Sequence, residues 1–172
     1  SELSYSDYEI GDVLEIAKGA GLDTHEITGT NSGENCLFDV SNEEKLRTTQ
    51  CLYFSCHGRF NFEKVSNSGI ILQNGNVLTL DDLFHKLRLP RCQLVVVSAC
   101  ETGRSDVLND TKGDEWVGLT SGFILSGSDC VISALWPVDD HATYLLLTKM
   151  FKIMNEKKKK DGQLVVDVAN SL

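Results

Sequence analysis

The stretch CQLVVVSACETG, residues 92–103, decides how this chain folds. Its residues from Leu94 to Val97 are apolar without alternation, which is typical of a strand buried on both faces of a parallel sheet. The run ends in Cys100, which is followed by an acid, a threonine and a glycine. A thiol at the end of a buried strand belongs either to the core or to a functional site.

Helix and strand patterns alternate along the rest of the chain. Strands are predicted at 24–28, 50–56 and 129–136, and Asn74-Gly75 predicts a hairpin over 68–80. Thr79 has Asp82 at the capping-box distance. Helices are predicted at 8–21, 30–40, 79–87, 114–127, 139–160 and 163–172. This order predicts an α/β fold with a mostly parallel sheet flanked by helices.

Composition limits the classes of function. A length of 172 residues with 41% hydrophobic content suits a single globular domain over 1–172. The net charge of −9 argues against a nucleic-acid partner. We expect no membrane partner and a cytoplasmic location, since no long apolar run or signal peptide is visible. Because the chain lacks a first strand and stops within a helix pattern, we expect the domain to be truncated at both ends.

The chain contains six cysteines, which we expect to be reduced thiols because the domain is large enough to hold a sufficient core. There is no C-x-x-C pair, and the adjacency of Cys56 and His57 suits a tetrahedral zinc site poorly. We therefore predict neither a metal nor another cofactor. The cysteines are Cys36, Cys51, Cys56, Cys92, Cys100 and Cys130.

Two predicted strands end in chemically useful residues. The strand at 50–56 runs into His57-Gly58, and the strand after residue 93 runs into Cys100. If the strands are parallel neighbours, both groups emerge at the same edge, where sites form in open α/β sheets. An imidazole there can take the proton of a thiol and later protonate a leaving amine. Either residue alone would more often be a packing residue.

Three motifs resemble one family in their order and spacing. They are YFSCHGRF (53–60), VVVSACETG (95–103) and GLTSGFILSGSDCVISALWPVDDHAT (118–143). Over about residues 25–172 the chain resembles the CHAT family, caspase-like domains associated with tetratricopeptide repeats. The resemblance implies a caspase-like three-layer sandwich and a dyad with Cys100 as nucleophile and His57 as acid/base. It also implies an oxyanion hole from the backbone N–H groups of Gly58 and Cys100.

The segment ALWPVDDHAT (134–143) bears on substrate preference. It is similar to the separase segment L-W-x-V-x-D, whose aspartate holds a basic P1 side chain. The resemblance implies that Asp140 lies in the S1 pocket, with Asp139 beside it and Trp136 as a wall. Such a pocket would favour cleavage after Arg or Lys. Alternatively, the two aspartates only complement the dipole at a helix start, or each fills one role.

We therefore expect a cysteine endopeptidase that acts on protein substrates. The family resemblance implies gating by repeat or sensor domains of the same polypeptide. The alternative is a catalytically inactive interaction or scaffold module that keeps the caspase-like fold.

Overall fold

The computed structural model describes residues 6–27, 36–38, 40–59, 61, 63–72, 75–101, 112–134 and 138–161. The chain divides into two compact units, one formed by residues 1–26 and 138–172 and the other by residues 27–137. The larger unit contains the sheet, whereas the smaller unit contains the first and last helices.

Five strands of the described residues form one sheet in the order β3-β2-β1-β4-β5. β1 (Cys51–Arg59), β4 (Leu94–Glu101) and β5 (Val131–Ser133) are parallel neighbours. β2 (Gly69–Ile71) is antiparallel to both β1 and β3 (Val77–Thr79), so β3 runs in the direction of the parallel strands. Four of the five strands thus share one direction, and the predicted mostly parallel sheet is confirmed.

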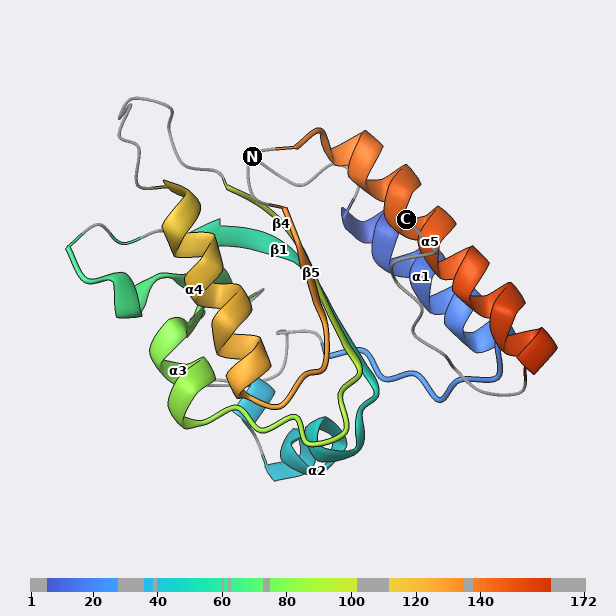
Figure 1. Cartoon of the computed structure of the whole chain (residues 1–172), viewed down its shortest axis with the longest axis horizontal. Helices are drawn as coiled ribbons and strands as arrows, with labels where there is room; N and C mark the ends of the chain where they lie inside the picture. Colours follow the sequence, from blue (N-terminus) through green and yellow to red (C-terminus); the bar gives the residue numbers. More distant parts are fainter. Residues whose placement is uncertain are drawn as a thin grey trace. The chain divides into compact units, whose positions relative to one another are not determined.

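One face of the sheet is covered by α3 (Leu80–His85) and α4 (Lys112–Leu125), which lie on the same side of it in Figure 1. The ring of Phe123 in α4 lies 5.5 Å from that of Phe54 in β1, measured between centroids. The α/β fold class with flanking helices is therefore confirmed. The buried cluster on this face includes Phe54, Ile70, Leu78, Leu80, Leu83, Leu87, Leu89, Val95, Val97, Leu119 and Phe123.

β4 is buried along its whole apolar run, as its lack of alternation predicts. Val95 and Val97 belong to the cluster under α3 and α4, and they are 0% and 4% exposed. Leu94 and Val96 alternate with them and are 0% and 1% exposed, although they lie outside that cluster. Both faces of this strand are thus removed from solvent, which is the environment that unbroken aliphatic strands require.

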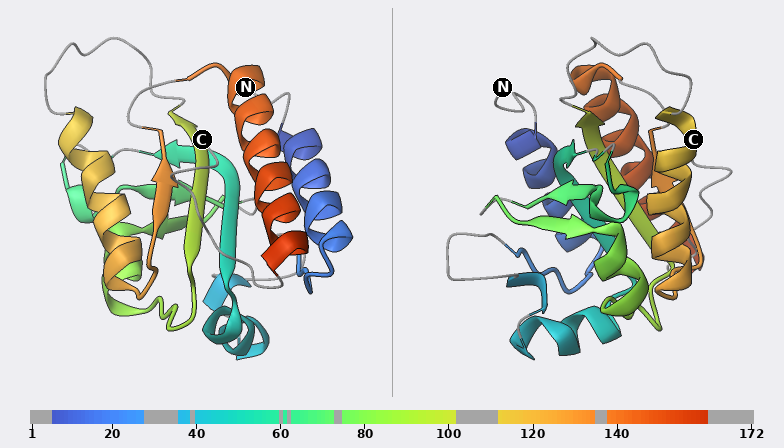
Figure 2. Two further views of the ribbon diagram at one scale, coloured as in Figure 1. Left: turned by 45° about the vertical axis from the view of Figure 1, so that its right-hand side comes forward. Right: turned by 90° about the vertical axis from the view of Figure 1, so that its left-hand side faces the viewer.

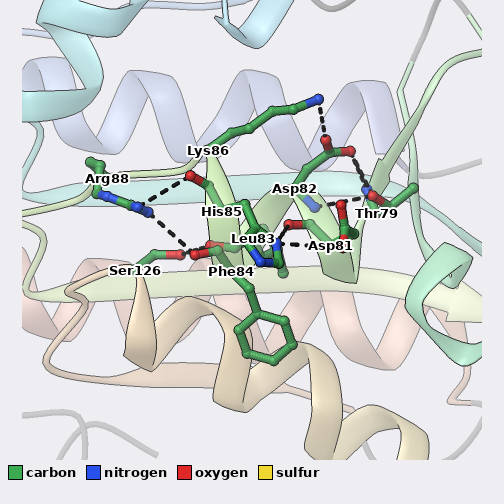
Figure 3. Close-up of polar contacts among 9 residues, drawn as sticks. All are labelled: Thr79, Asp81, Asp82, Leu83, Phe84, His85, Lys86, Arg88 and Ser126. Carbon is green, nitrogen blue, oxygen red and sulfur yellow. Dashed lines mark hydrogen bonds and ion pairs between the residues drawn. The ribbon is translucent and has the colours of Figure 1, made fainter.

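The predicted hairpin and helix cap are both present. β2 and β3 pair antiparallel around Gly75, whose φ of 81° is the left-handed conformation that glycine adopts at little cost. The Thr79 hydroxyl accepts a hydrogen bond from the Asp82 backbone N–H, and the Asp82 carboxylate accepts one from the Thr79 N–H. Figure 3 shows this reciprocal capping box at the start of α3.

Among the described residues, the smaller unit contains two helices that lie side by side, α1 (Ser6–Gly19) and α5 (Asp140–Asp161), as Figures 1 and 2 show. The Tyr144 hydroxyl donates a hydrogen bond of 2.6 Å to the Asp12 carboxylate. Further along both helices, the Asn155 amide nitrogen donates to the Ile16 carbonyl at 3.2 Å. α1 was predicted from its apolar spacing and α5 from the acids at its start and the lysines at its end, and both helices are confirmed.

The structure differs from two predictions between residues 24 and 40, although residues 28–35 and 39 lie outside the described residues. Residues 24–27 form no strand: His25 and Glu26 are exposed, and Ile27 is the one apolar residue of this segment that packs against the core cluster. The helix predicted at 30–40 is replaced, in the described residues, by a 3-10 helix (Cys36–Phe38) followed by α2 (Val40–Thr48). α2 is mostly polar and has Leu46 as its buried apolar anchor, so it shows little periodicity. The helix predicted at 163–172 lies outside the described residues.

Candidate active site

The candidate site lies where β1 and β4 end. The two strands are parallel and pair without interruption from Cys51 opposite Leu94 to Gly58 opposite Glu101. In this register His57 is the direct partner of Cys100. Neighbouring strands are about 4.8 Å apart, so the two backbone positions are adjacent. The sequence-based expectation that these residues emerge together at one edge of the sheet thus agrees with the backbone register.

Alternation along the strands assigns this pair to one face. Phe54 belongs to the cluster under α3 and α4, and Leu52 and Cys56 pack against that cluster. Side chains alternate between faces along a strand, so His57 belongs to the opposite face. Because Phe54 pairs with Val97, and His57 pairs with Cys100, the register position of Cys100 is in the same row as His57.

The imidazole of His57 is distinctive in its hydrogen bonding. Its Nδ1 atom is buried and has no hydrogen-bond partner among the residues that the structure describes. A buried polar atom of this kind costs free energy, and such atoms call for an explanation in structure or function. A neutral imidazole has one unprotonated ring nitrogen, which is able to accept a proton from a substrate or from a nearby nucleophile.

Two serines form the preceding pair on this face. Ser55 pairs with Ser98 in the register, and both side chains are half-buried. They lie two positions before His57 and Cys100, and therefore in the same rows. Sequence reasoning did not single them out, although spacing by two residues in neighbouring strands was a signal that could have done so.

Four other cysteines, Cys51, Cys56, Cys92 and Cys130, are free thiols that are buried or half-buried. Burial raises the pKa of Cys51 to about 12, with a smaller effect from Cys92 nearby, and burial raises the pKa of Cys56 to about 11. Burial also raises the pKa of Cys92 and of Cys130. These thiols stay protonated near neutral pH, which suits packing better than nucleophilic attack.

Asp139 and Asp140 lie at the start of α5 in the smaller unit. The Asp139 carboxylate accepts a 2.9 Å hydrogen bond from the backbone N–H of Ala142, which is the geometry of a helix N-cap. Asp140 is the first residue of the helix and is half-buried. Asp139 therefore caps the helix, as the alternative in the sequence analysis expects. The contact of Asp140 with substrate stays a prediction. Trp136 lies outside the described residues.

Among the described residues, no group of three or more histidine, cysteine or acidic side chains is arranged to hold a metal ion. The same residues include no helix that is both long enough and apolar enough to cross a membrane. A comparison with curated proteins found no match. The sequence model of the CHAT domain matches residues 1–165 of the 172-residue chain. The chain therefore belongs to the CHAT domain family, which is related in fold to caspase-like cysteine peptidases.

Proposed function

We propose that this chain is a cysteine endopeptidase domain that uses Cys100 as nucleophile and His57 as general acid and base. The single observation that carries the proposal is the register of β1 and β4, which makes these two residues direct partners at the carboxyl end of parallel strands. Sites in open α/β sheets form at this end. The buried Nδ1 of His57, with no partner among the described residues, supports the same assignment.

The chemistry follows from these two groups. His57 takes the thiol proton, and the Cys100 thiolate attacks the carbonyl carbon of the scissile peptide bond. The backbone N–H groups of Gly58 and Cys100 would stabilise the oxyanion that forms, as the family resemblance implies. His57 then gives its proton to the leaving amine. Water hydrolyses the acyl-enzyme with His57 as base, which regenerates the thiol.

We further propose cleavage after a basic P1 residue. Asp140 would face the guanidinium or ammonium group of the substrate, with Trp136 as a wall of the pocket, while Asp139 serves as the cap of α5. The resemblance to the separase segment supports this division of roles. Family membership also supports gating by repeat or sensor domains of the same polypeptide. The free thiols of Cys51, Cys56, Cys92 and Cys130 support a cytoplasmic location.

The test is covalent labelling by a peptidyl acyloxymethyl ketone with arginine at P1, followed by intact mass spectrometry. One adduct per chain is expected for the natural sequence and none for Cys100→Ala. Cys56→Ala is the matched control, because Cys56 is next to His57 in sequence but packs against the core on the opposite face. It should be labelled as fast as the natural sequence.

Absence of labelling, together with absence of cleavage in a peptide library randomised at P1, would contradict the peptidase and favour the alternative, an inactive interaction or scaffold module. A peptide library read at P1 completes the test. Preference for Asp or Leu at P1 would discard the basic pocket and leave the dyad standing. His57→Ala should lower the rate of acylation by about 10²–10⁴-fold, the usual contribution of a general acid or base.

A further inference from the structure

Arg59 is the last residue of β1 and lies two positions beyond His57. It pairs with Gly69 of β2, so its backbone is held within the sheet rather than in a loop. Two residues along a strand span about 7 Å and return to the same face. The guanidinium, on a three-carbon stem, can therefore reach the space beside the imidazole of His57.

The side chain of Arg59 is exposed and has no ionic partner among the described residues. Two other cations of this unit are paired: Arg47 with Glu43 at 3.3 Å, and Lys86 with Asp82 at 2.7 Å. Arg91 is likewise exposed and forms no ion pair among the described residues, so what sets Arg59 apart is its position at the end of β1, two residues beyond His57.

Glu101, the acidic residue at the end of the neighbouring strand, is not in the row of side chains that contains His57 and Arg59. Glu101 is the register partner of Gly58, whereas Arg59 alternates with Gly58 and follows the row of His57. The described face of β1 at this end therefore presents an imidazole and then a cation. Arg59 lies farther than His57 toward the carboxyl end of β1, because the strand runs on past His57 in that direction.

We propose that Arg59 determines specificity by binding a carboxylate of the substrate on the leaving-group side of the scissile bond. The inference rests on the proposed function. His57 has to contact the leaving amine to protonate it, so the segment after the scissile bond departs along the side of His57 rather than that of Cys100. The next charged group on that side of the strand is Arg59.

A guanidinium binds a carboxylate through two parallel hydrogen bonds, which an ammonium group does not reproduce. The preferred substrate is therefore a protein segment with an aspartate or glutamate at the first or second residue after the cut. Together with the proposed basic P1 residue, this predicts a signature in which a cation precedes the scissile bond and an anion follows it.

The test uses fluorogenic peptides with arginine at P1 that differ only in having glutamate, glutamine or lysine at one of the two positions after the cut. The natural sequence should cleave the best glutamate peptide about tenfold faster in kcat/KM than its lysine counterpart, the range of a charge-assisted hydrogen bond. Arg59→Glu should reverse this order. Arg59→Lys should keep part of the preference, because lysine keeps the positive charge but cannot form the two parallel hydrogen bonds of a guanidinium.

Arg91→Glu is the matched control. Arg91 is an exposed cation before the amino end of β4, at the opposite end of the strand from Cys100. The substitution changes the net charge as Arg59→Glu does and should leave the preference unchanged. Labelling by the peptidyl ketone provides a second control, because that probe lacks the residues after the cut. Arg59→Glu should be labelled at the rate of the natural sequence.

Each outcome decides between this inference and the proposed function. Cleavage without preference between glutamate and lysine, or a preference that Arg59→Glu leaves in place, overturns the role of Arg59 and leaves the peptidase standing. Slower labelling of Arg59→Glu shows a disturbed site and also overturns the specific role. Absence of both labelling and cleavage in the natural sequence overturns the proposed function and this inference with it.

Discussion

The parallel strands β1, β4 and β5 have cysteines at both ends, and the surroundings of these cysteines differ between the amino end and the carboxyl end. At the amino end, Cys51 begins β1, and Cys92 and Cys130 stand just before β4 and β5. Burial raises the pKa of each of these thiols. At the carboxyl end, Cys100 stands opposite His57. The position of a cysteine along its strand, rather than its residue type, therefore distinguishes the packing thiols from the candidate nucleophile.

Cys56 separates two effects, the end of the strand and the face of the sheet. It lies near the carboxyl end of β1 and is adjacent to His57 in sequence. Its side chain packs against the cluster under α3 and α4, and burial raises its pKa to about 11. The end of the strand is therefore not enough to make a thiol reactive. The face matters as well, since alternation directs successive side chains to opposite sides of the sheet.

The largest expected effect is on thiol reactivity. At neutral pH, Cys100 should react with iodoacetamide about 100-fold or more faster than Cys51 or Cys56, because only thiolates attack and buried thiols stay protonated. Peptide mapping by mass spectrometry over time measures each rate. In Cys100→Ala, Cys51 and Cys56 should keep their slow reactions. Labelling of Cys51 or Cys56 as fast as Cys100 would break the comparison.

Phe123→Ala tests the protected face. Phe123 is 0% exposed and contacts Phe54, so its truncation should lower the free energy of unfolding by about 3–5 kcal/mol. The same change should speed alkylation of Cys56, which packs against this cluster. Urea unfolding provides the first measurement. Ile124→Ala, at a side chain that is 44% exposed, should cost much less. Equal losses in the two variants would contradict the assignment of the core.

Gly69→Ala tests whether the hairpin of β2 and β3 supports the carboxyl end of β1. A Cβ at this position would overlap with the Leu78 carbonyl oxygen, so β2 and β3 would have to move apart. We expect a loss of about 1–3 kcal/mol in unfolding free energy. Because β2 also pairs with β1 from His57 to Arg59, labelling of Cys100 should become slower.

Gly11→Ala is the control for that variant. A Cβ at Gly11 in α1 meets no atom within 4 Å, and alanine in a helix is favoured over glycine by about 0.5–1 kcal/mol. This variant should be slightly more stable and label normally. A Gly69→Ala protein with unchanged stability and labelling would show that the hairpin does not support the site.

The smallest expected effect concerns Asp82. Burial alone would raise the pKa of Asp82, but hydrogen bonds from Lys86 and Thr79 outweigh it and hold the pKa below its usual value. A carboxyl group with a lowered folded-state pKa stabilises the fold above its unfolded pKa of about 3.9, and this stability is lost as the pH falls through the folded value. Asp82→Asn should therefore cost about 1 kcal/mol near neutral pH.

Urea unfolding at several pH values checks this prediction. The difference between Asp82→Asn and the natural sequence should shrink as the pH falls below about 4. Asp81→Asn is the neighbouring control. Its carboxylate forms an exposed pair with His85 at 3.4 Å, and such pairs contribute about 0–1 kcal/mol. A cost of Asp82→Asn that does not change with pH would exclude the carboxylate as its source.

Local chemistry made much of the fold predictable. The hairpin at Gly75, the cap formed by Thr79 and Asp82, and the buried run of β4 each follow from interactions between near neighbours or from an unbroken apolar pattern. α2 and the absence of a strand at 24–27 were missed. There the pattern is weak, and long-range packing of a single residue such as Leu46 decides the structure.

The fold class, the family and the two residues of the proposed dyad could be predicted from the sequence, because apolar patterns and motif order depend on residues that are close together in the chain. The three-dimensional structure was needed to show that His57 stands opposite Cys100, that Cys56 lies on the other face and that Asp139 caps a helix. The physical reason is register. Strands 43 positions apart in the chain, as His57 and Cys100 are, align through hydrogen bonds between the strands, and those contacts leave no local pattern in the sequence.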